Sequence, residues 1–267
     1  MALIHCNFFS HILGMATSMD VILPDRPAIS GGGGAAEDYP CLLLLHGLSD
    51  DHTIWQRRTS IERYVQPLGL AVVMPNAHRS FYSNMVHGPD YWTFISAEVL
   101  AVARSFFRLS ARRENNFAAG ISMGGYGAFK LALRHPERFA AAVSLSGALD
   151  IAPRVLNPEE PLVEDFRRIF GEDADIRGSG DDLFACASAL AAAPGLRPKL
   201  YAWCGTEDFL YADNLRFRDH ARSLGLDLTY SESRGGHDWD CWDLQIQQAL
   251  SWLAALLPGL PRASRET

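Results

Sequence analysis

The residues with the clearest chemical potential in this chain are a serine and the two glycines that flank it. Gly120-Ile121-Ser122-Met123-Gly124 has the pattern G-x-S-x-G and lies between a short apolar run and an apolar, glycine-punctuated segment. A serine on such a strand-to-helix turn has its hydroxyl exposed above the sheet. Glycines are needed beside it because the turn brings two stretches of backbone together. The pentapeptide also occurs by chance, and the serine is then an ordinary turn residue.

A serine hydroxyl is a weak nucleophile at neutral pH, so we expect a base beside it and an acid that orients the base. The chain order nucleophile, acid, histidine is typical of α/β-hydrolases, and Ser122, Asp208 and His237 follow it. Asp208 comes just after a predicted strand, and His237 lies in a glycine-rich turn before the last predicted helix. Glu207, beside Asp208, and Asp150, after the preceding strand, stay open as alternatives for the acid.

These residues also have plain structural interpretations. Asp208 could simply cap a helix N-terminus, where aspartate is favoured, and His237 could be a packed or surface histidine. His46 abuts a predicted strand but precedes the serine, so it fits a structural role in the loop expected to supply an oxyanion donor. No H-E-x-x-H or similar ligand spacing occurs, and we therefore expect no metal site.

A tetrahedral intermediate needs hydrogen-bond donors for its oxyanion. One is expected from the backbone N–H of Met123, directly after the serine. The other is expected from Leu48, in the loop that follows the apolar run 41–45. The helix predicted to begin at Met123 adds the positive end of its dipole.

Apolar strand segments alternate with helical segments, which predicts an α/β fold with a mostly parallel central sheet and helices on both faces. The candidate residues then fall at the carboxyl ends of strands, where ligands bind in such sheets. The predicted strands are 3–9, 18–23, 41–45, 70–74, 116–119, 139–145, 200–204 and 226–231. The predicted helices are 55–66, 94–109, 123–134, 213–224 and one that carries Trp239 and the apolar positions after it.

We expect one domain over residues 1–267, with a small lid or cap inserted at 150–193. The cap is expected to hold two short helices, 162–170 and 182–192. The Gly31–Gly34 run predicts a flexible loop, to which we assign no chemistry.

Residues 76–93 form a long predicted loop that is rich in aromatic and polar side chains. Loops of this length in compact domains often bind ligands. The aromatic residues from Phe81 to Trp92 could shape an acyl or alcohol pocket, although core packing explains about half of these rings equally well. His78 and His87 lie in the same loop and could line that pocket.

Composition narrows the class of protein. The 267 residues are 48% apolar and carry a formal net charge of −7, which suits one large domain with a core. Without a basic run we expect no nucleic-acid partner and no membrane partner. No apolar stretch is long enough to span a bilayer, and no signal peptide is recognisable. The five cysteines are scattered without C-x-x-C spacing, which favours a reduced, cytoplasmic protein.

Four linked segments resemble the esterase D / tributyrin esterase group of α/β-hydrolases, which has S-formylglutathione hydrolases as close relatives. The resemblance runs in order over almost the whole chain, from Phe8-Phe9-Ser10 to the last helix. Tyr126 favours the tributyrin-esterase branch, since the formylglutathione branch tends towards histidine there. The segments are Leu44-Leu45-His46-Gly47-Leu48, Gly120-Ile121-Ser122-Met123-Gly124-Gly125-Tyr126-Gly127, Cys204-Gly205-Thr206-Glu207-Asp208-Phe209-Leu210 and Gly235-Gly236-His237-Asp238-Trp239.

The resemblance implies that Ser122, Asp208 and His237 are the nucleophile, acid and base, and that Leu48 and Met123 provide the oxyanion donors. It also implies a cytosolic serine carboxylesterase for short-chain acyl esters, without a cofactor and often a homo-oligomer. The alternatives are an S-formylglutathione hydrolase-like thioesterase and an esterase that releases acetyl or feruloyl groups from carbohydrate. A binding protein that has lost turnover is a third interpretation, which the complete set of site residues argues against.

Overall fold

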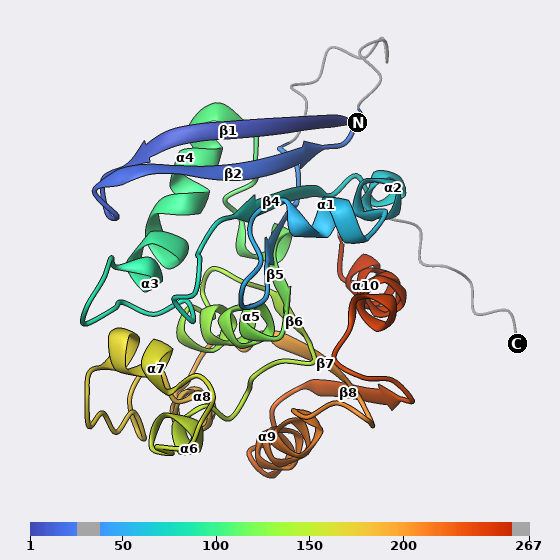
Figure 1. Cartoon of the computed structure of the whole chain (residues 1–267). Helices are drawn as coiled ribbons and strands as arrows, with labels where there is room; N and C mark the ends of the chain where they lie inside the picture. Colours follow the sequence, from blue (N-terminus) through green and yellow to red (C-terminus); the bar gives the residue numbers. More distant parts are fainter. Residues whose placement is uncertain (26–37, 258–267) are drawn as a thin grey trace, which may run out of the picture.

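The computed structural model describes residues 1–25 and 38–257, so the predicted Gly31–Gly34 loop lies outside the described residues (Figure 1). In the described part, eight strands form one sheet in the order β1-β2-β4-β3-β5-β6-β7-β8. Strands β3 to β8 run parallel to one another, while β1 and β2 form an antiparallel hairpin that joins β4. The strands are β1 (Ala2–Ser10), β2 (Met15–Leu23), β3 (Cys41–Leu45), β4 (Ala71–Pro75), β5 (Asn116–Ile121), β6 (Ala141–Leu145), β7 (Lys199–Gly205) and β8 (Leu228–Ser233).

Helices cover both faces of the sheet because alternate strand residues point to opposite sides and both sets are apolar. Leu43 and Leu45 of β3 belong to one core with α4, α5, α8 and α9, whereas Leu42 and Leu44 belong to a second core with α1, α2 and α10. In Figure 1, α10 lies on the opposite side of the central strands from α5. The helices are α1 (Ile54–Arg58), α2 (Ile61–Val65), α3 (Tyr91–Thr93), α4 (Val99–Phe106), α5 (Met123–Arg134), α6 (Ala152–Val155), α7 (Val163–Phe170), α8 (Leu183–Ala192), α9 (Tyr211–Ser223) and α10 (Trp239–Ala254).

Two predicted helices differ in the structure. The single helix predicted over 55–66 is wrong, because α1 and α2 are separate short helices. Thr59 is extended, with φ of −136° and ψ of 171°, and both its N–H and its hydroxyl donate to the carbonyl of Trp55, at 3.0 and 2.6 Å. The N–H of Ile61 donates to Thr59 Oγ1 at 3.1 Å and not to a carbonyl of the preceding turn, so α1 does not continue into α2. The helix predicted over 94–109 begins earlier, with α3, passes through a wider π-helical turn and ends with α4.

The chain between β6 and β7 contains the segment predicted as an insertion, 150–193. The two helices expected there are α7 and α8, and the four-residue helix α6 is an addition that no periodic pattern predicts. Helix α8 packs against α5 and α9, whereas α6 and α7 pack against each other.

No helix in the described residues is long and apolar enough to cross a membrane.

Candidate active site

Ser122 lies in the tight turn between β5 and α5, and its backbone is strained. Its φ of 52° and ψ of −118° are unusual for a residue with a side chain and cost on the order of 1–3 kcal/mol. The neighbouring glycines permit this turn. A Cβ on Gly120 would lie 2.3 Å from the carbonyl carbon of Gly124, and a Cβ on Gly124 would lie 2.4 Å from the carbonyl oxygen of Leu45. Both spacings exclude any larger residue.

Three of the residues singled out in the sequence meet through hydrogen bonds at neighbouring strand ends. His237 Nε2 lies 3.0 Å from Ser122 Oγ, and His237 Nδ1 lies 2.9 Å from Asp208 Oδ2. The buried Asp208 also accepts a hydrogen bond at Oδ1 from the N–H of Leu210 at 2.8 Å. An imidazole that donates from Nδ1 to a carboxylate leaves Nε2 free to accept the serine proton. The arrangement can therefore activate the hydroxyl as a nucleophile.

Hydrogen bonds keep the Asp208 carboxylate in its charged form. Burial alone would raise its pKa, but the hydrogen bond with His237, the charge of a protonated His237 and the N–H of Leu210 together lower the pKa below its ordinary value. A charged carboxylate at this position favours the imidazolium that forms when His237 takes a proton.

The two alternative acids have other partners. Asp150 accepts a hydrogen bond from Arg216 Nε at 2.8 Å, and Glu207 accepts one from Arg234 Nε at 2.9 Å. The carboxylate that faces the imidazole is Asp208.

Two aromatic rings enclose the imidazole, and sequence reasoning did not identify them as part of the site. The ring of Phe209 lies 4.5 Å from that of His237, and the ring of Trp242 packs edge-on at 4.8 Å. Phe209 is 66% exposed, which is unusual for phenylalanine. Its position directly after Asp208 is the one sequence signal that points to it.

His46 holds the loop expected to supply the second oxyanion donor. Its Nδ1–H donates to the carbonyl of Gly47 at 2.7 Å, and its Nε2 accepts from the N–H of Ala77 at 2.9 Å. Burial lowers the pKa of His46 to about 4, which keeps the ring neutral. Of the two expected donors, Leu48 borders the same cavity as the serine, and Met123 begins α5 directly after the serine.

A cavity of about 420 Å³ opens beside Ser122 and His237, and we call it the substrate cavity. Among the described residues, the loop 76–93 contributes Phe81 to its lining, whereas Tyr82, Tyr91 and Trp92 are buried in the core and His78 packs edge-on against Tyr91. Most of the remaining wall is apolar and comes from the segment 148–166 and from Phe209 and Leu210.

The wall of the substrate cavity also includes a positively charged side chain, that of Arg154, which sequence reasoning did not identify. Arg154 Nε and Nη2 lie 3.1 and 2.9 Å from Asp213 Oδ2, and Glu160 approaches Nη1 at 3.5 Å. These contacts join α6 to α9, and no local pattern in the sequence predicts them. In the described residues, no group of three or more His, Cys, Asp or Glu side chains is arranged to hold a metal ion.

The fold and the strained serine turn define the class of this protein as α/β-hydrolase. A family model described as "Putative esterase" matches residues 10–253, and the chain belongs to this esterase family. An acetyl esterase from Caldicellulosiruptor saccharolyticus is 32% identical over 262 residues, which cover 95% of this chain and 98% of that protein.

Solved structures agree with this assignment. FphF, a fluorophosphonate-binding serine hydrolase of Staphylococcus aureus, has a TM-score of 0.87 and 37% identity over 95% of this chain and 98% of its own. S-formylglutathione hydrolase (FrmB) of the same organism has a TM-score of 0.85 with equal identity and coverage. The predicted fold class and family resemblance are confirmed, and these similarities support a serine esterase.

Proposed function

We propose that this chain is a serine carboxylesterase that hydrolyses short-chain acyl esters, with Ser122 as the nucleophile, His237 as the base and Asp208 as the orienting acid. The observation that carries the proposal is the chain of hydrogen bonds from Asp208 through His237 to Ser122 Oγ. It lies beside a mostly apolar cavity that suits a small acyl group. Similarity to an acetyl esterase supports the same substrate class.

The first half-reaction forms an acyl-enzyme. Ser122 Oγ attacks the ester carbonyl carbon while its proton passes to His237 Nε2. The oxyanion accepts hydrogen bonds from the N–H groups of Met123 and Leu48. When the intermediate collapses, the bond to the alkoxy group breaks, and His237 gives the proton to the leaving alcohol.

The second half-reaction repeats these steps with water. His237 takes a proton from the water, whose oxygen attacks the acyl carbon, and the carboxylic acid leaves as the proton returns to Ser122 Oγ. Asp208 keeps its charge throughout and favours the imidazolium in both steps. The whole cycle begins and ends with the hydrogen bond between Ser122 and His237, and it consumes one ester and one water to give one alcohol and one carboxylic acid.

A thioester substrate is the second candidate, favoured by the similarity to an S-formylglutathione hydrolase. The same nucleophile and oxyanion donors serve a thioester carbonyl. Comparing kcat/KM for p-nitrophenyl acetate, an acetylated sugar, a feruloyl ester and S-formylglutathione separates the candidates, because specificity is the ratio of these constants. A cytoplasmic location, a homo-oligomer and the absence of a cofactor stay predictions.

Substitution of the nucleophile tests the proposal. Ser122→Ala should lower kcat for p-nitrophenyl acetate by at least about 10⁴-fold, because the attacking oxygen is gone. Ser105→Ala is a matched control, since the exposed hydroxyl of Ser105 bonds to the carbonyl of Val102 in its own helix. Wild-type turnover by folded Ser122→Ala protein would contradict the proposal.

A further inference from the structure

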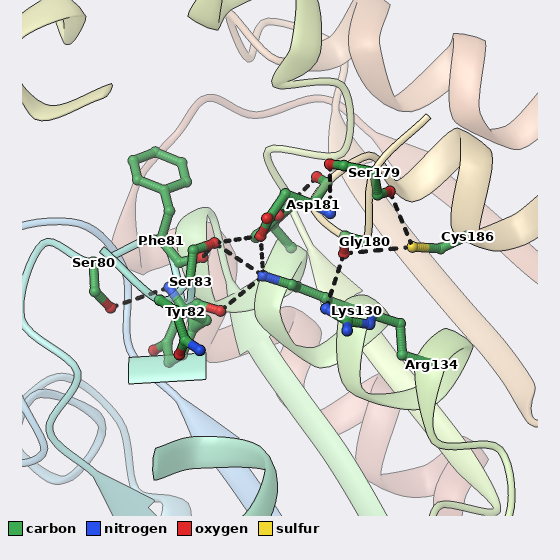
Figure 2. A network of polar contacts seen from close by, with 12 residues as sticks. Ser80, Phe81, Tyr82, Ser83, Lys130, Arg134, Ser179, Gly180, Asp181 and Cys186 are labelled. Carbon is green, nitrogen blue, oxygen red and sulfur yellow. Dashed lines mark hydrogen bonds and ion pairs between the residues drawn. The ribbon is translucent and has the colours of Figure 1, made fainter. Parts of the chain in front are cut away.

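A fully buried lysine, Lys130, lies in a network of polar contacts with Tyr82, Ser83 and Asp181 (Figure 2). Lys130, on α5, donates to the carbonyl oxygen of Tyr82 and contacts Ser83 Oγ, each at 2.9 Å, and it also bonds to the carboxylate of Asp181. These contacts use the three donors of an ammonium group. Lys130 thereby joins α5 to the loop 76–93 and to the segment before α8.

Stability alone does not account for a charge at this position. A buried ion pair is often no more stabilising than apolar residues of similar size, because both charges lose their hydration. Burial lowers the pKa of Lys130 to about 8, although Asp181 counteracts this effect. The Lys130 ammonium also lies 4.6 Å from the ring centre of Trp92. The Lys130–Asp181 pair is therefore better explained by a role in holding the backbone around it in one conformation than by a gain in stability.

The backbone next to Lys130 is strained. Phe81 and Tyr82 are consecutive residues with φ of 47° and 49°, a left-handed conformation that residues with side chains rarely adopt. Such conformations persist only when the surroundings hold them. Lys130 binds the Tyr82 carbonyl, and Ser83 Oγ lies 2.7 Å from Asp181 Oδ1 and 3.1 Å from the Phe81 carbonyl. The network thus contacts the strained turn at two adjacent carbonyl groups.

This turn contacts both parts of the site that meet a substrate. The ring of Phe81 lines the substrate cavity and lies 5.1 Å from the ring of Phe166, which lines it too. The hydroxyl of Tyr82 donates to the carbonyl of His46 at 2.8 Å, two residues before Leu48. A shift of the turn would therefore move the cavity wall and the support of the oxyanion loop.

We propose that Lys130 and Asp181 form a positioning pair that sets acyl-chain selectivity by holding the Phe81-Tyr82 turn against the substrate cavity. This inference rests on the proposed esterase function. Among the described residues, the cavity lining includes Phe81 but neither member of the pair, so the pair acts through Phe81. One methylene group in an apolar pocket changes kcat/KM by roughly 10- to 200-fold. A displaced Phe81 should therefore change the relative rates for acetyl and butyryl esters by about tenfold.

The test compares Lys130→Met, Asp181→Asn and the double variant with the wild type. Each single variant should melt at a lower temperature because it leaves one partner without its counter-charge, and the double variant should recover most of that loss. The butyrate-to-acetate ratio of kcat/KM should stay shifted by about tenfold in the double variant. Backbone amides of the Phe81–Ser83 segment should exchange faster with deuterium in that variant, because the contacts that hold the turn are gone.

Either of two results for the double variant would overturn the inference: a wild-type selectivity ratio or unchanged deuterium exchange at Phe81–Ser83. A selectivity ratio that returns to the wild-type value together with the melting temperature would show a purely structural role and overturn the inference. Lys199→Met, which breaks an exposed pair with Asp227, is the control and should leave the ratio unchanged. If the wild type hydrolyses neither ester, the proposed function fails separately, and unchanged exchange at Phe81–Ser83 in the double variant still overturns the pair's hold on the turn.

Discussion

Alanine at Gly124 should force apart the serine turn and the loop that carries Leu48. The added Cβ would lie 2.4 Å from the carbonyl oxygen of Leu45 and 2.7 Å from that of His46. Both are backbone atoms, so no side-chain rotation relieves the contact. Because Cβ contacts under 3.0 Å essentially never occur, α5 and the end of β3 must separate by at least about 0.6 Å.

This separation moves the two proposed oxyanion donors apart. Met123 directly precedes Gly124, and Leu48 lies two residues after His46, whose carbonyl the new Cβ would meet. Losing one oxyanion donor costs about 10²–10³ in kcat, and a misplacement of 1 Å costs about 10²-fold. For the smaller movement at Gly124 we expect kcat for p-nitrophenyl acetate to fall about 10- to 100-fold. Overpacking should also lower the free energy of unfolding by about 1–3 kcal/mol.

Steady-state kinetics and urea unfolding of Gly124→Ala measure the two effects. Gly88→Ala is the matched control, because the one atom among its three nearest neighbours that its Cβ would approach within 3.0 Å is Met85 Sδ, at 2.9 Å near the end of a flexible side chain, and none of the three is a backbone atom. If folded Gly124→Ala protein keeps the wild-type kcat, then the spacing of the serine turn and the Leu48 loop does not govern the reaction, and our assignment of the oxyanion donors is wrong.

Three further predictions have distinct expected outcomes. Asp208→Asn should lower kcat by about 10³–10⁴-fold in ester assays because the imidazole loses its orienting charge, whereas Glu207→Gln should retain activity. Burial lowers the pKa of His46 from 6.5 to about 4, so the unfolded chain binds more protons between these pH values. The free energy of unfolding should therefore fall by about 3 kcal/mol as pH drops from 6.5 to 4, and His46→Asn should remove this share of the slope in urea titrations. Phe209→Ala should lower kcat/KM about 2- to 5-fold without changing the melting temperature, because the exposed ring adds a cation–π contact to protonated His237.

The sequence indicates Ser122, Asp208 and His237 because each stands next to a local signal. Buried runs predict strands, glycines and chain order mark the turns after them, and the carboxyl ends of parallel strands share one edge of the sheet. Thr59 shows the limit of this reasoning, since helical spacing over 55–66 gives no sign that the hydroxyl of Thr59 would accept the N–H of Ile61 and separate α1 from α2.

The rest of the site depends on contacts between segments that are distant in the sequence. Lys130 meets Asp181 across 51 positions, and Arg154 meets Asp213 across 59. A lysine in a helix is ordinarily a solvated residue, so only the packing of three segments around Lys130 reveals its burial. The cavity wall is likewise assembled from separate segments, and one of them contains α6, a helix that the sequence does not predict.

Covalent labelling of the proposed nucleophile tests the central claim most directly. We would treat the folded protein with a fluorophosphonate, which reacts with activated serines, and locate the adduct by peptide mass spectrometry. The account predicts one adduct on the peptide that carries Ser122, and none in Ser122→Ala protein. An unlabelled folded wild type, or an adduct on a different residue that persists in Ser122→Ala, would contradict it.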